Sequence, residues 1–406
     1  MGRPEPEIRP LGPADDLGAQ LDLGARAFGT ASPARAERLR QVLSLLIEQG
    51  NVLGAFCGGR AAGSAAFHDT RQWWHGRAVP MAAVSSVKVA PEDRGRGIGR
   101  ALMTALLRQI AGRGYPLSAL YPATMPLYRS LGWELAGGMY TAVIPARSLR
   151  VPAPPDVPAA ALTSGMPADG PALRRAGPGD AGAVVSVRSQ AHEAARDCGP
   201  LTWDAATLRL WLADQDLYAY LCDDGFLAYR WEDGNQAIAV MAAQGTSAGT
   251  VRALWAHVAS YGSVAEKVYA RVGPADALWW LGREPDADVA HREMWMLRVV
   301  DAPAAIAARG FPAAVSLTVP LAIADAALPG NAGRWRLAVA DGKGSLTRQG
   351  AAAAQLELGA RGLAALYAGT PVTTLRQAGL ASGGRPDDDA ALDAAFAAAP
   401  YMLDTF

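Results

Sequence analysis

The segment Val84–Met103 constrains the fold more than any other part of the chain, because it predicts a strand, a glycine-rich turn and the start of a helix. Its centre is Arg94-Gly95-Arg96-Gly97-Ile98-Gly99, where small residues leave the backbone N–H groups unobstructed. Apolar residues then recur at helical spacing: Ile98, Leu102, Met103, Leu106, Leu107 and Ile110. Backbone amides at the first turn of a helix bind anions, because the helix dipole adds its positive end. The segment therefore predicts a pyrophosphate site.

Other interpretations of this glycine loop fit less well. The alternative without a functional role is an ordinary strand-to-helix turn, which would bind no ligand. A dinucleotide-binding fingerprint requires an early strand, the glycine turn, a helix and a second strand ending in an acidic residue, and the chain lacks this order. A Walker loop is excluded because no Gly-Lys-Ser/Thr follows.

The loop resembles the acetyl-CoA loop of the GNAT acetyltransferase superfamily, whose pattern Arg/Gln-x-x-Gly-x-Gly/Ala follows a strand with alternating valines. Arg94, Gly97 and Gly99 occupy the pattern positions. The resemblance implies that acetyl-CoA is the cosubstrate and that its pantetheine arm pairs, like an added strand, with the main chain of Val87, Lys88 and Val89. It also implies that the pyrophosphate is cradled by Gly95, Arg96, Gly97, Ile98, Gly99 and Arg100.

A tyrosine downstream of the loop is the candidate general acid. Tyr128 lies in a predicted helix that is followed by a Leu-Gly-Trp turn ending at Trp133. In the superfamily, a tyrosine at this place protonates the departing thiolate of CoA. A phenol, with an ordinary pKa of about 10, stays protonated at neutral pH and can give that proton. The alternative is a tyrosine packed by its ring, and Tyr121 is a weaker candidate for the acid.

Composition excludes several classes of protein. The chain has 406 residues, of which 50% are hydrophobic, enough for roughly two or three domains. Residues 1–150 contain 18 Lys and Arg against 11 Asp and Glu, which suits a polyanionic cosubstrate. Basic clusters interleaved with aromatic residues are missing, so nucleic-acid binding is not expected.

The sequence also gives no reason to expect disulfides, metal sites or membrane spans. Cys57, Cys198 and Cys222 lie far apart and the five histidines are scattered, so neither a disulfide scaffold nor a metal site is expected. No leader opens the chain and no apolar run approaches the roughly 18 residues of a membrane span. We therefore expect a cytoplasmic protein that binds no membrane.

The chain divides into three predicted domains: 1–150, 151–296 and 297–406. In the first, apolar spacing predicts a helix around Leu39–Leu46, and strands are expected at 51–57 and 59–68 on either side of Gly58 and Gly59. The Pro- and Ala-rich stretch 151–171 is interpreted as a linker or an extended crossover that proline stiffens. Strand, Gly/Pro turn, Asp and helix then recur: Leu173–Val187 echoes Ile8–Leu23.

The second domain continues with predicted strands at 217–223, 225–231 and 237–241 and then a helix, but without the Arg-x-x-Gly-x-Gly loop. It therefore looks like a second acetyltransferase domain that has lost its cofactor site. The last domain differs, with predicted strands at 314–320, 333–340 and 344–347 and helices at 360–367 and 390–399. Asp387, Asp388 and Asp389 are placed to favour the N-terminus of the final helix.

The order of these segments resembles the enhanced intracellular survival (Eis) family of N-acetyltransferases. The resemblance implies an α/β (α+β) fold with tandem GNAT-like domains, the second degenerate, and a C-terminal domain similar to sterol carrier proteins. It implies a homohexamer, and an acceptor of the polyamine type, such as an aminoglycoside or a lysine side chain. In that family the last residue, typically Phe, supplies its α-carboxylate as general base, and this sequence ends in Phe406.

Two departures from the family pattern affect the site. Gly95 stands where other members carry an arginine, so one phosphate contact is expected to be weaker. The usual Ala-Ser-Glu before the catalytic tyrosine is Pro122-Ala123-Thr124 here, so Ala123 and Thr124 would meet CoA by position and an acid of the amine pocket is lost. The predicted activity is acetyl transfer from acetyl-CoA to an amine by direct attack. The alternatives are the same chemistry on an unrelated small amine, and a non-catalytic protein that binds acyl-CoA or lipid.

Overall fold

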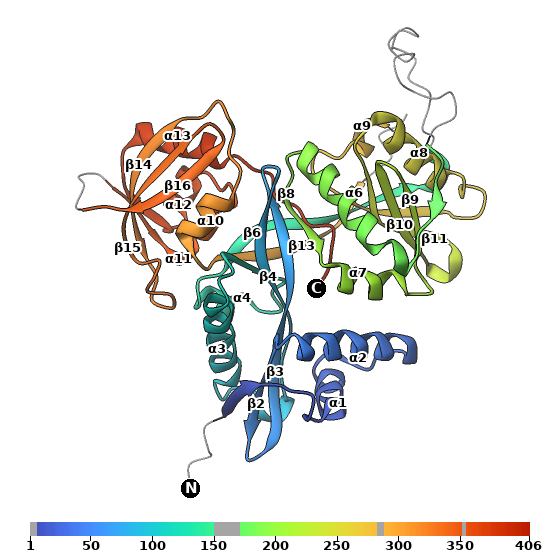
Figure 1. The fold of residues 1–406 in the computed structure, drawn as a ribbon, viewed down its shortest axis with the longest axis horizontal. Coiled ribbons are helices and arrows are strands. Elements are labelled where there is room, and N and C mark those ends of the chain that lie inside the picture. The colour runs from blue at the N-terminus through green and yellow to red at the C-terminus, as the bar shows by residue number, and fades with distance from the viewer. Residues whose placement is uncertain (1–5, 150–170, 282–287, 351–354) are drawn as a thin grey trace.

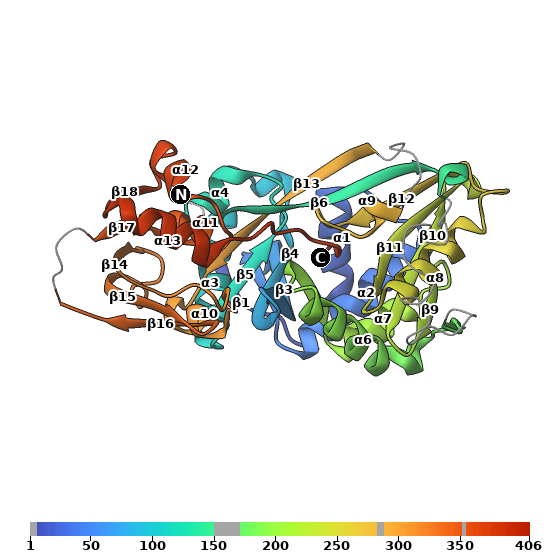
Figure 2. The ribbon, with the colours of Figure 1, turned by 90° about the horizontal axis from the view of Figure 1, so that it is seen from above.

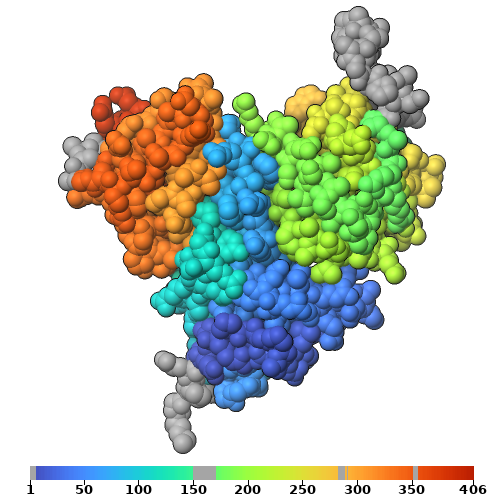
Figure 3. Space-filling model, viewed as in Figure 1, coloured from blue at the N-terminus to red at the C-terminus, as the bar shows by residue number. Residues whose placement is uncertain are grey.

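The computed structural model describes residues 6–149, 171–281, 288–350 and 355–406, which form three lobes (Figure 1). The first two lobes share one 13-stranded sheet, and the third has a five-stranded sheet of its own. The second and third lobes, green-yellow and orange-red in Figure 3, each rest on the blue first lobe. Within the described residues, no helix is long and apolar enough to cross a membrane. The predicted linker 151–171 lies almost wholly outside the described residues.

The first lobe carries the glycine loop. The helix predicted around Leu39–Leu46 and the two strands flanking Gly58 and Gly59 are confirmed, and the second of these strands runs six residues beyond its predicted end. The elements in chain order are β1 (Glu7–Pro10), α1 (Leu17–Phe28), α2 (Pro33–Glu48), β2 (Val52–Cys57), β3 (Arg60–Trp74), β4 (Arg77–Val89), α3 (Ile98–Gly112), β5 (Leu117–Leu120), α4 (Met125–Arg129) and β6 (Glu134–Pro145).

The second lobe exchanges strands with the first. Its last strand, β13, lies between β5 and β6 of the first lobe, and β6 in turn pairs with β12. The lobe consists of β7 (Arg174–Arg175), α6 (Ala181–Ala194), β8 (Cys198–Trp203), α7 (Ala205–Leu212), β9 (Tyr218–Cys222), β10 (Gly225–Glu232), β11 (Ala237–Gly245), α8 (Ala248–Ala259), β12 (Lys267–Val272), α9 (Leu278–Leu281) and β13 (Asp288–Val299). The two lobes therefore fix one another's position through backbone hydrogen bonds.

The repeat seen in the sequence is preserved in atomic detail. After β1, Asp15 accepts from the N–H of Gly12 at 2.8 Å and pairs with Arg9 at 2.6 Å. After β7, Asp180 accepts from the N–H of Gly177 at 2.9 Å and pairs with Arg174 at 2.7 Å. The same residue types stand at the same spacing in both turns. The helix cap differs: in the first copy the next residue, Asp16, caps α1 through its side chain.

The third lobe contains α10 (Ala302–Ala308), β14 (Leu317–Ala324), β15 (Gly333–Ala340), β16 (Lys343–Arg348), β17 (Leu356–Gly359), α11 (Ala360–Tyr367), α12 (Val372–Gln377), β18 (Ala381–Gly383) and α13 (Pro386–Phe396). Its first strand begins three residues later than predicted, and its final helix begins four residues earlier, so the three aspartates lie inside the first turn. Fully buried Arg298 at the end of β13 joins the lobes through a pair with Asp325 at 2.6 Å.

After α13, residues 397–406 form a tail that returns to the junction of the first two lobes, where the C-terminal label lies in Figures 1 and 2. Tyr401 N–H donates to the carbonyl of Cys198, and Met402 N–H to that of Gly138. The tail crosses two glycines very closely: a Cβ on Gly137 would lie 2.2 Å from Pro400 O, and one on Gly199 2.2 Å from Tyr401 O. Only glycine permits this crossing, so both lobes are shaped to receive the tail.

Candidate active site

Two parallel strands of the first lobe separate beside the glycine loop. β4 and β5 pair from Met81 with Leu117 to Val84 with Leu120, and after that point β4 continues without β5. The pairing of β4 with β3 also skips two residues, Ser86 and Val87, in a β-bulge. Ser86 has φ of 52°, an uncommon conformation for a residue with a side chain. The separation leaves a main-chain edge at Val87–Val89, as the resemblance requires for the pantetheine arm.

The glycine loop connects β4 to α3 in the predicted way. Gly95 and Gly97 have φ of 75° and 77°, and a Cβ on either would meet no heavy atom within 4 Å. Gly97 is the N-cap of the 15-residue α3 and supplies no side chain to the first N–H groups. The first turn contains no acidic residue, and Arg94 and Arg100 are exposed beside it. Unpaired amides, the positive helix end and open space fit a pyrophosphate.

One loop arginine has its position fixed by an acid. Arg96 pairs with the buried Asp93 of the short helix η1 (Pro91–Asp93), and Arg60 of β3 pairs with the same carboxylate at 2.6 Å. Burial alone would raise the pKa of Asp93, but the two guanidinium groups lower it overall. The carboxylate is therefore charged, and it orients Arg96 at the base of the loop.

The main chain and the side chain of Lys88 lie in different surroundings. Its main chain belongs to the exposed edge, whereas its side chain is buried on the side of α1 and donates to the carbonyl of Gln20 at 3.0 Å. Burial lowers the pKa of Lys88 to about 8. Its predicted contact with cofactor is a main-chain contact, so this placement of the amine is compatible with it.

Tyr128 lies on α4, close to the point where the strands separate. It is 4% exposed, its ring meets that of Trp133 edge-on at 6.5 Å, and burial raises its pKa. Among the described residues its hydroxyl has no hydrogen-bond partner, so no contact within them competes for its proton. Ala123 and Thr124 precede the helix and are exposed, with Thr124 at the N-cap.

Phe406 closes the tail inside a cavity of about 290 Å³ between the first and second lobes. Its ring lies 5.1 Å from that of Tyr121 and 6.4 Å from that of Trp203. Tyr121 donates its hydroxyl to the carbonyl of Asp404 at 2.9 Å, and burial raises the pKa of Tyr121 well above its usual value. Tyr121 is therefore engaged in holding the tail. This agrees with the weaker standing of Tyr121 as a general acid.

The Phe406 cavity adjoins a second cavity, of about 680 Å³, that reaches the bulge of β4. Val42 and His68 line both, and Ser85 and Ser86 line the second. His68 packs edge-on against Trp203 at 5.3 Å, and burial lowers its pKa to about 4, so it is neutral at physiological pH. The two cavities therefore lie side by side, one reaching the bulge and the other Phe406. Tyr128 and Phe406 belong to different clusters of packed side chains.

The second lobe has the equivalent strand and helix, but the helix end is already occupied. Ser247 caps α8 by accepting from the N–H of Thr250 at 3.2 Å. The carboxylate of Asp224 stands at the same end, bound to the hydroxyls of Thr246 and Thr250. Burial would raise the pKa of Asp224, but these hydroxyl groups lower it overall. A fixed negative charge opposes a second one, so this helix end does not suit a pyrophosphate.

Several residues of the site had no signal of their own in the sequence. In the sequence, His68 is one of five scattered histidines, and Tyr121 is only a weaker candidate than Tyr128 for the general acid. Arg188 of α6 pairs with Asp404 at 3.0 Å, and Arg271 of β12 donates to the carbonyl of Leu403 at 2.8 Å. Both anchor the tail from the second lobe, where the sequence indicated no site. The pattern of apolar and polar residues along a helix or strand does not distinguish an arginine that anchors the tail from an arginine exposed at the surface.

Comparison with known proteins places the chain in a family. Residues 7–136 and 199–299 each match an acetyltransferase (GNAT) domain, and residues 302–403 match a sterol carrier protein domain. A GCN5-related N-acetyltransferase from Kribbella flavida has 41% sequence identity and a TM-score of 0.90, with 99% of each chain covered. Eis1 from Mycobacterium abscessus has 27% identity and a TM-score of 0.76, over 98% of this chain and 100% of its own.

The N-acetyltransferase Eis of Mycobacterium tuberculosis is 29% identical over 78% of this chain and 78% of its own length. These matches define the class as an acetyltransferase with tandem GNAT domains and a sterol-carrier-like third domain, as the sequence predicted. The chain belongs to the GCN5-related N-acetyltransferases, and over most of its length it is similar to Eis proteins. Its acetyl donor is acetyl-CoA.

Proposed function

We propose that the protein transfers the acetyl group of acetyl-CoA directly to a primary amine that enters the Phe406 cavity. One observation carries this proposal: two cavities that share Val42 and His68 in their linings reach the β4 bulge and the last residue of the tail. Acetyl-CoA supplies an acetyl thioester, with its pyrophosphate on Gly95–Arg100 and its pantetheine arm along Val87–Val89. The separated strands and the uncapped α3 fit these two parts.

The proposed chemistry uses three groups of the chain. The α-carboxylate that Phe406 carries as the last residue of this sequence takes a proton from the acceptor ammonium, directly or through water. The backbone N–H at Val87 polarises the thioester carbonyl, because the bulge takes that residue out of register with β3. The amine nitrogen then bonds to the carbonyl carbon as the carbon–sulfur bond breaks. Tyr128 gives its proton to the departing thiolate, and the second proton lost by the acylated nitrogen returns through water to the Tyr128 oxygen.

The acceptor and the assembly are the finer parts of the proposal. The resemblance predicts a polyamine-type acceptor, an aminoglycoside or a lysine side chain, and an unrelated small amine is the alternative. It also predicts a homohexamer and a cytoplasmic location. These remain predictions.

The test is release of CoA thiol from acetyl-CoA in the presence of aminoglycosides, polyamines, lysine peptides and arylalkylamines. General acid–base groups contribute about 10²- to 10⁴-fold to rate, so Tyr128→Phe and deletion of Phe406 should each lower kcat at least about 100-fold. Tyr115→Phe is the matched control: it removes a tyrosyl hydroxyl beyond the far end of α3 and should leave kcat unchanged. Full turnover in either test variant removes the role assigned to that residue.

A further inference from the structure

The cavity around Phe406 is where the acceptor lies under the proposed function, and its lining is rich in arginine. Four arginines line it, against two side-chain carboxylates and the α-carboxylate proposed for Phe406: Arg38, Arg188, Arg230 and Arg271, with Asp214 and Asp404. A cavity that selects a polycation needs the opposite balance, because like charges repel each other. The charge of this cavity therefore bears on the acceptor.

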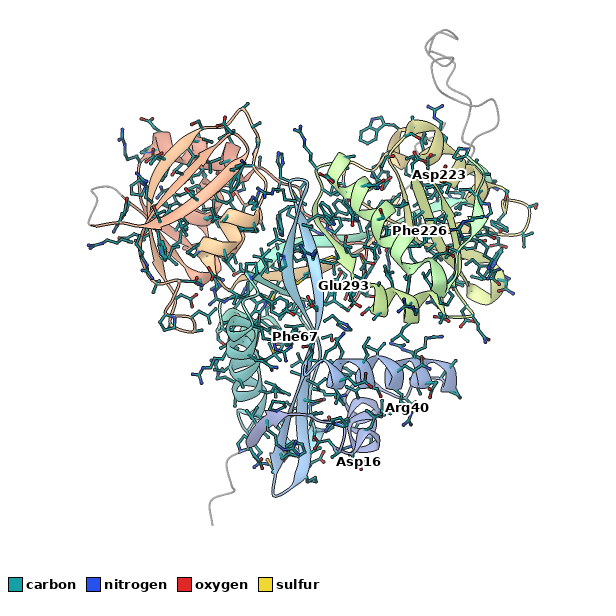
Figure 4. All side chains as sticks on the ribbon, in the orientation of Figure 1. Asp16, Arg40, Phe67, Asp223, Phe226 and Glu293 are labelled. Atoms are coloured by element: carbon teal, nitrogen blue, oxygen red, sulfur yellow. The ribbon has the colours of Figure 1, made fainter. Side chains whose placement is uncertain are left out.

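Two of the four arginines are occupied by the tail. Arg188 has a side chain only 2% exposed, and its charge is paired with Asp404. Arg271 donates to the carbonyl of Leu403, three residues before the chain's last residue. Glu293 of β13, labelled where the lobes meet in Figure 4, acts electrostatically on Arg271 but does not line the cavity. These arginines position the tail and are not offered to a ligand.

The other two arginines share one carboxylate. Arg38 of α2 lies 2.8 Å from Asp214 Oδ1, and Arg230 of β10 lies 2.6 Å from Asp214 Oδ2. The Asp214 side chain is 2% exposed. Asp216 lies 3.8 Å from Arg38, but its side chain is 73% exposed, so solvent screens it. Each guanidinium carries five N–H groups, more than Asp214 can accept. The pair therefore presents about one excess positive charge and unused donors to the cavity.

Apolar side chains line the same cavity as this arginine pair and the tail. Trp203, Leu208, Trp211 and Met241 line the same cavity, and the ring of Trp203 contacts that of Phe406. Such walls favour a flat apolar body, and few polar side chains other than the charged ones line the cavity: Gln41, His68, Thr207 and Thr405. The cavity is thus amphipathic, with the terminal residue at one side and the arginine pair as its cationic group.

We infer that the acceptor is a primary amine whose aromatic or other apolar body also carries a carboxylate, with the amine at Phe406 and the carboxylate bound by Arg38 and Arg230. A monoanion matches the single excess charge of the pair, and planar guanidinium groups bind carboxylates in a bidentate way. This inference rests on the proposed function, because it assumes that the amine is acetylated in this cavity. It differs from the polyamine expectation in the sign of the acceptor's second charge.

The test uses three amines of one shape: 4-(2-aminoethyl)benzoate, its carboxamide, and the diamine 4-(2-aminoethyl)benzylamine. We expect kcat/KM for the carboxylate to exceed that for the carboxamide at least about tenfold, with the diamine lowest. Arg38→Gln and Arg230→Gln, made separately so that Asp214 keeps one partner, should each remove most of this preference by raising KM. The kcat/KM for the carboxamide should fall much less than that for the carboxylate. Arg209→Gln, exposed on α7 and outside the cavity lining, is the matched control.

The outcomes separate this inference from the proposed function. Equal kcat/KM for the three amines, or a carboxylate preference that survives in both arginine variants, overturns the inference while leaving the acetyltransfer mechanism intact. If none of the amines is acetylated, the proposed function loses its support, and calorimetry with the same compounds decides the inference. Binding of the carboxylate that weakens in both variants supports it, and equal binding of all three compounds refutes it.

Discussion

The position of the tail should depend on one buried ion pair, that of Asp404 with Arg188, and Asp404→Asn tests this dependence. Asn keeps the shape of the side chain and leaves the main-chain contact of Asp404 with Tyr121 unchanged. A hydrogen bond to a charged group contributes about 1.5–3 kcal/mol. The 2% exposed Arg188 side chain would also lose its only carboxylate within the described residues, which adds to the cost. Since 1.4 kcal/mol corresponds to a factor of about ten, the released form of the tail should gain at least about tenfold in population.

Carboxypeptidase digestion, followed by intact-protein mass, measures that population directly, because only a released tail reaches the protease. We expect Asp404→Asn to be trimmed about tenfold faster than the unmodified protein. Its kcat for an amine without a second charged group, such as the carboxamide above, should fall. The Kd of acetyl-CoA should not change, because the glycine loop does not contact the tail. Asp387→Asn, exposed in the first turn of α13, is the matched control. Trimming and kcat equal to those of the unmodified protein would refute the role of the pair. Gly199→Ala, which places a Cβ 2.2 Å from Tyr401 O, should release the tail independently.

Three further outcomes follow from the structure. Gly97→Ala forces a side chain into φ of 77°, at about 1–2 kcal/mol, and should raise the Kd of acetyl-CoA about tenfold, whereas Gly112→Ala at the far end of α3 should not. The pKa of His68, lowered to about 4 from 6.5, means that the unfolded chain binds more protons between these pH values. Acidification from pH 6.5 to 4 should therefore lower the free energy of unfolding of the unmodified protein by about 3 kcal/mol. The His68→Gln variant should not lose this amount, and urea unfolding measures both. Light scattering should give a mass six times that of the 42.3 kDa chain, and a monomer would contradict the predicted hexamer.

Local features of the fold were predictable because their causes are local. Gly95 and Gly97 were expected in a turn at the start of a helix, and both have the positive φ that glycine tolerates best. The apolar spacing after the loop corresponds to the buried face of α3. The predicted repeat is confirmed by the pair of turns at Asp15 and Asp180, since a side chain that hydrogen-bonds three residues back leaves its spacing in the sequence.

The sequence by itself thus determined the type of fold and the glycine turn that opens α3, because glycine conformation, helical periodicity and capping act within a few residues. Only the tertiary structure decided the place of β13 between β5 and β6, the seating of the tail on Gly137 and Gly199, and the charge of the acceptor cavity. Arg38 and Asp214 stand 176 positions apart, and their pairing arises where two lobes pack together. No pattern along the chain encodes such a contact, because it depends on how strands from distant segments share one sheet.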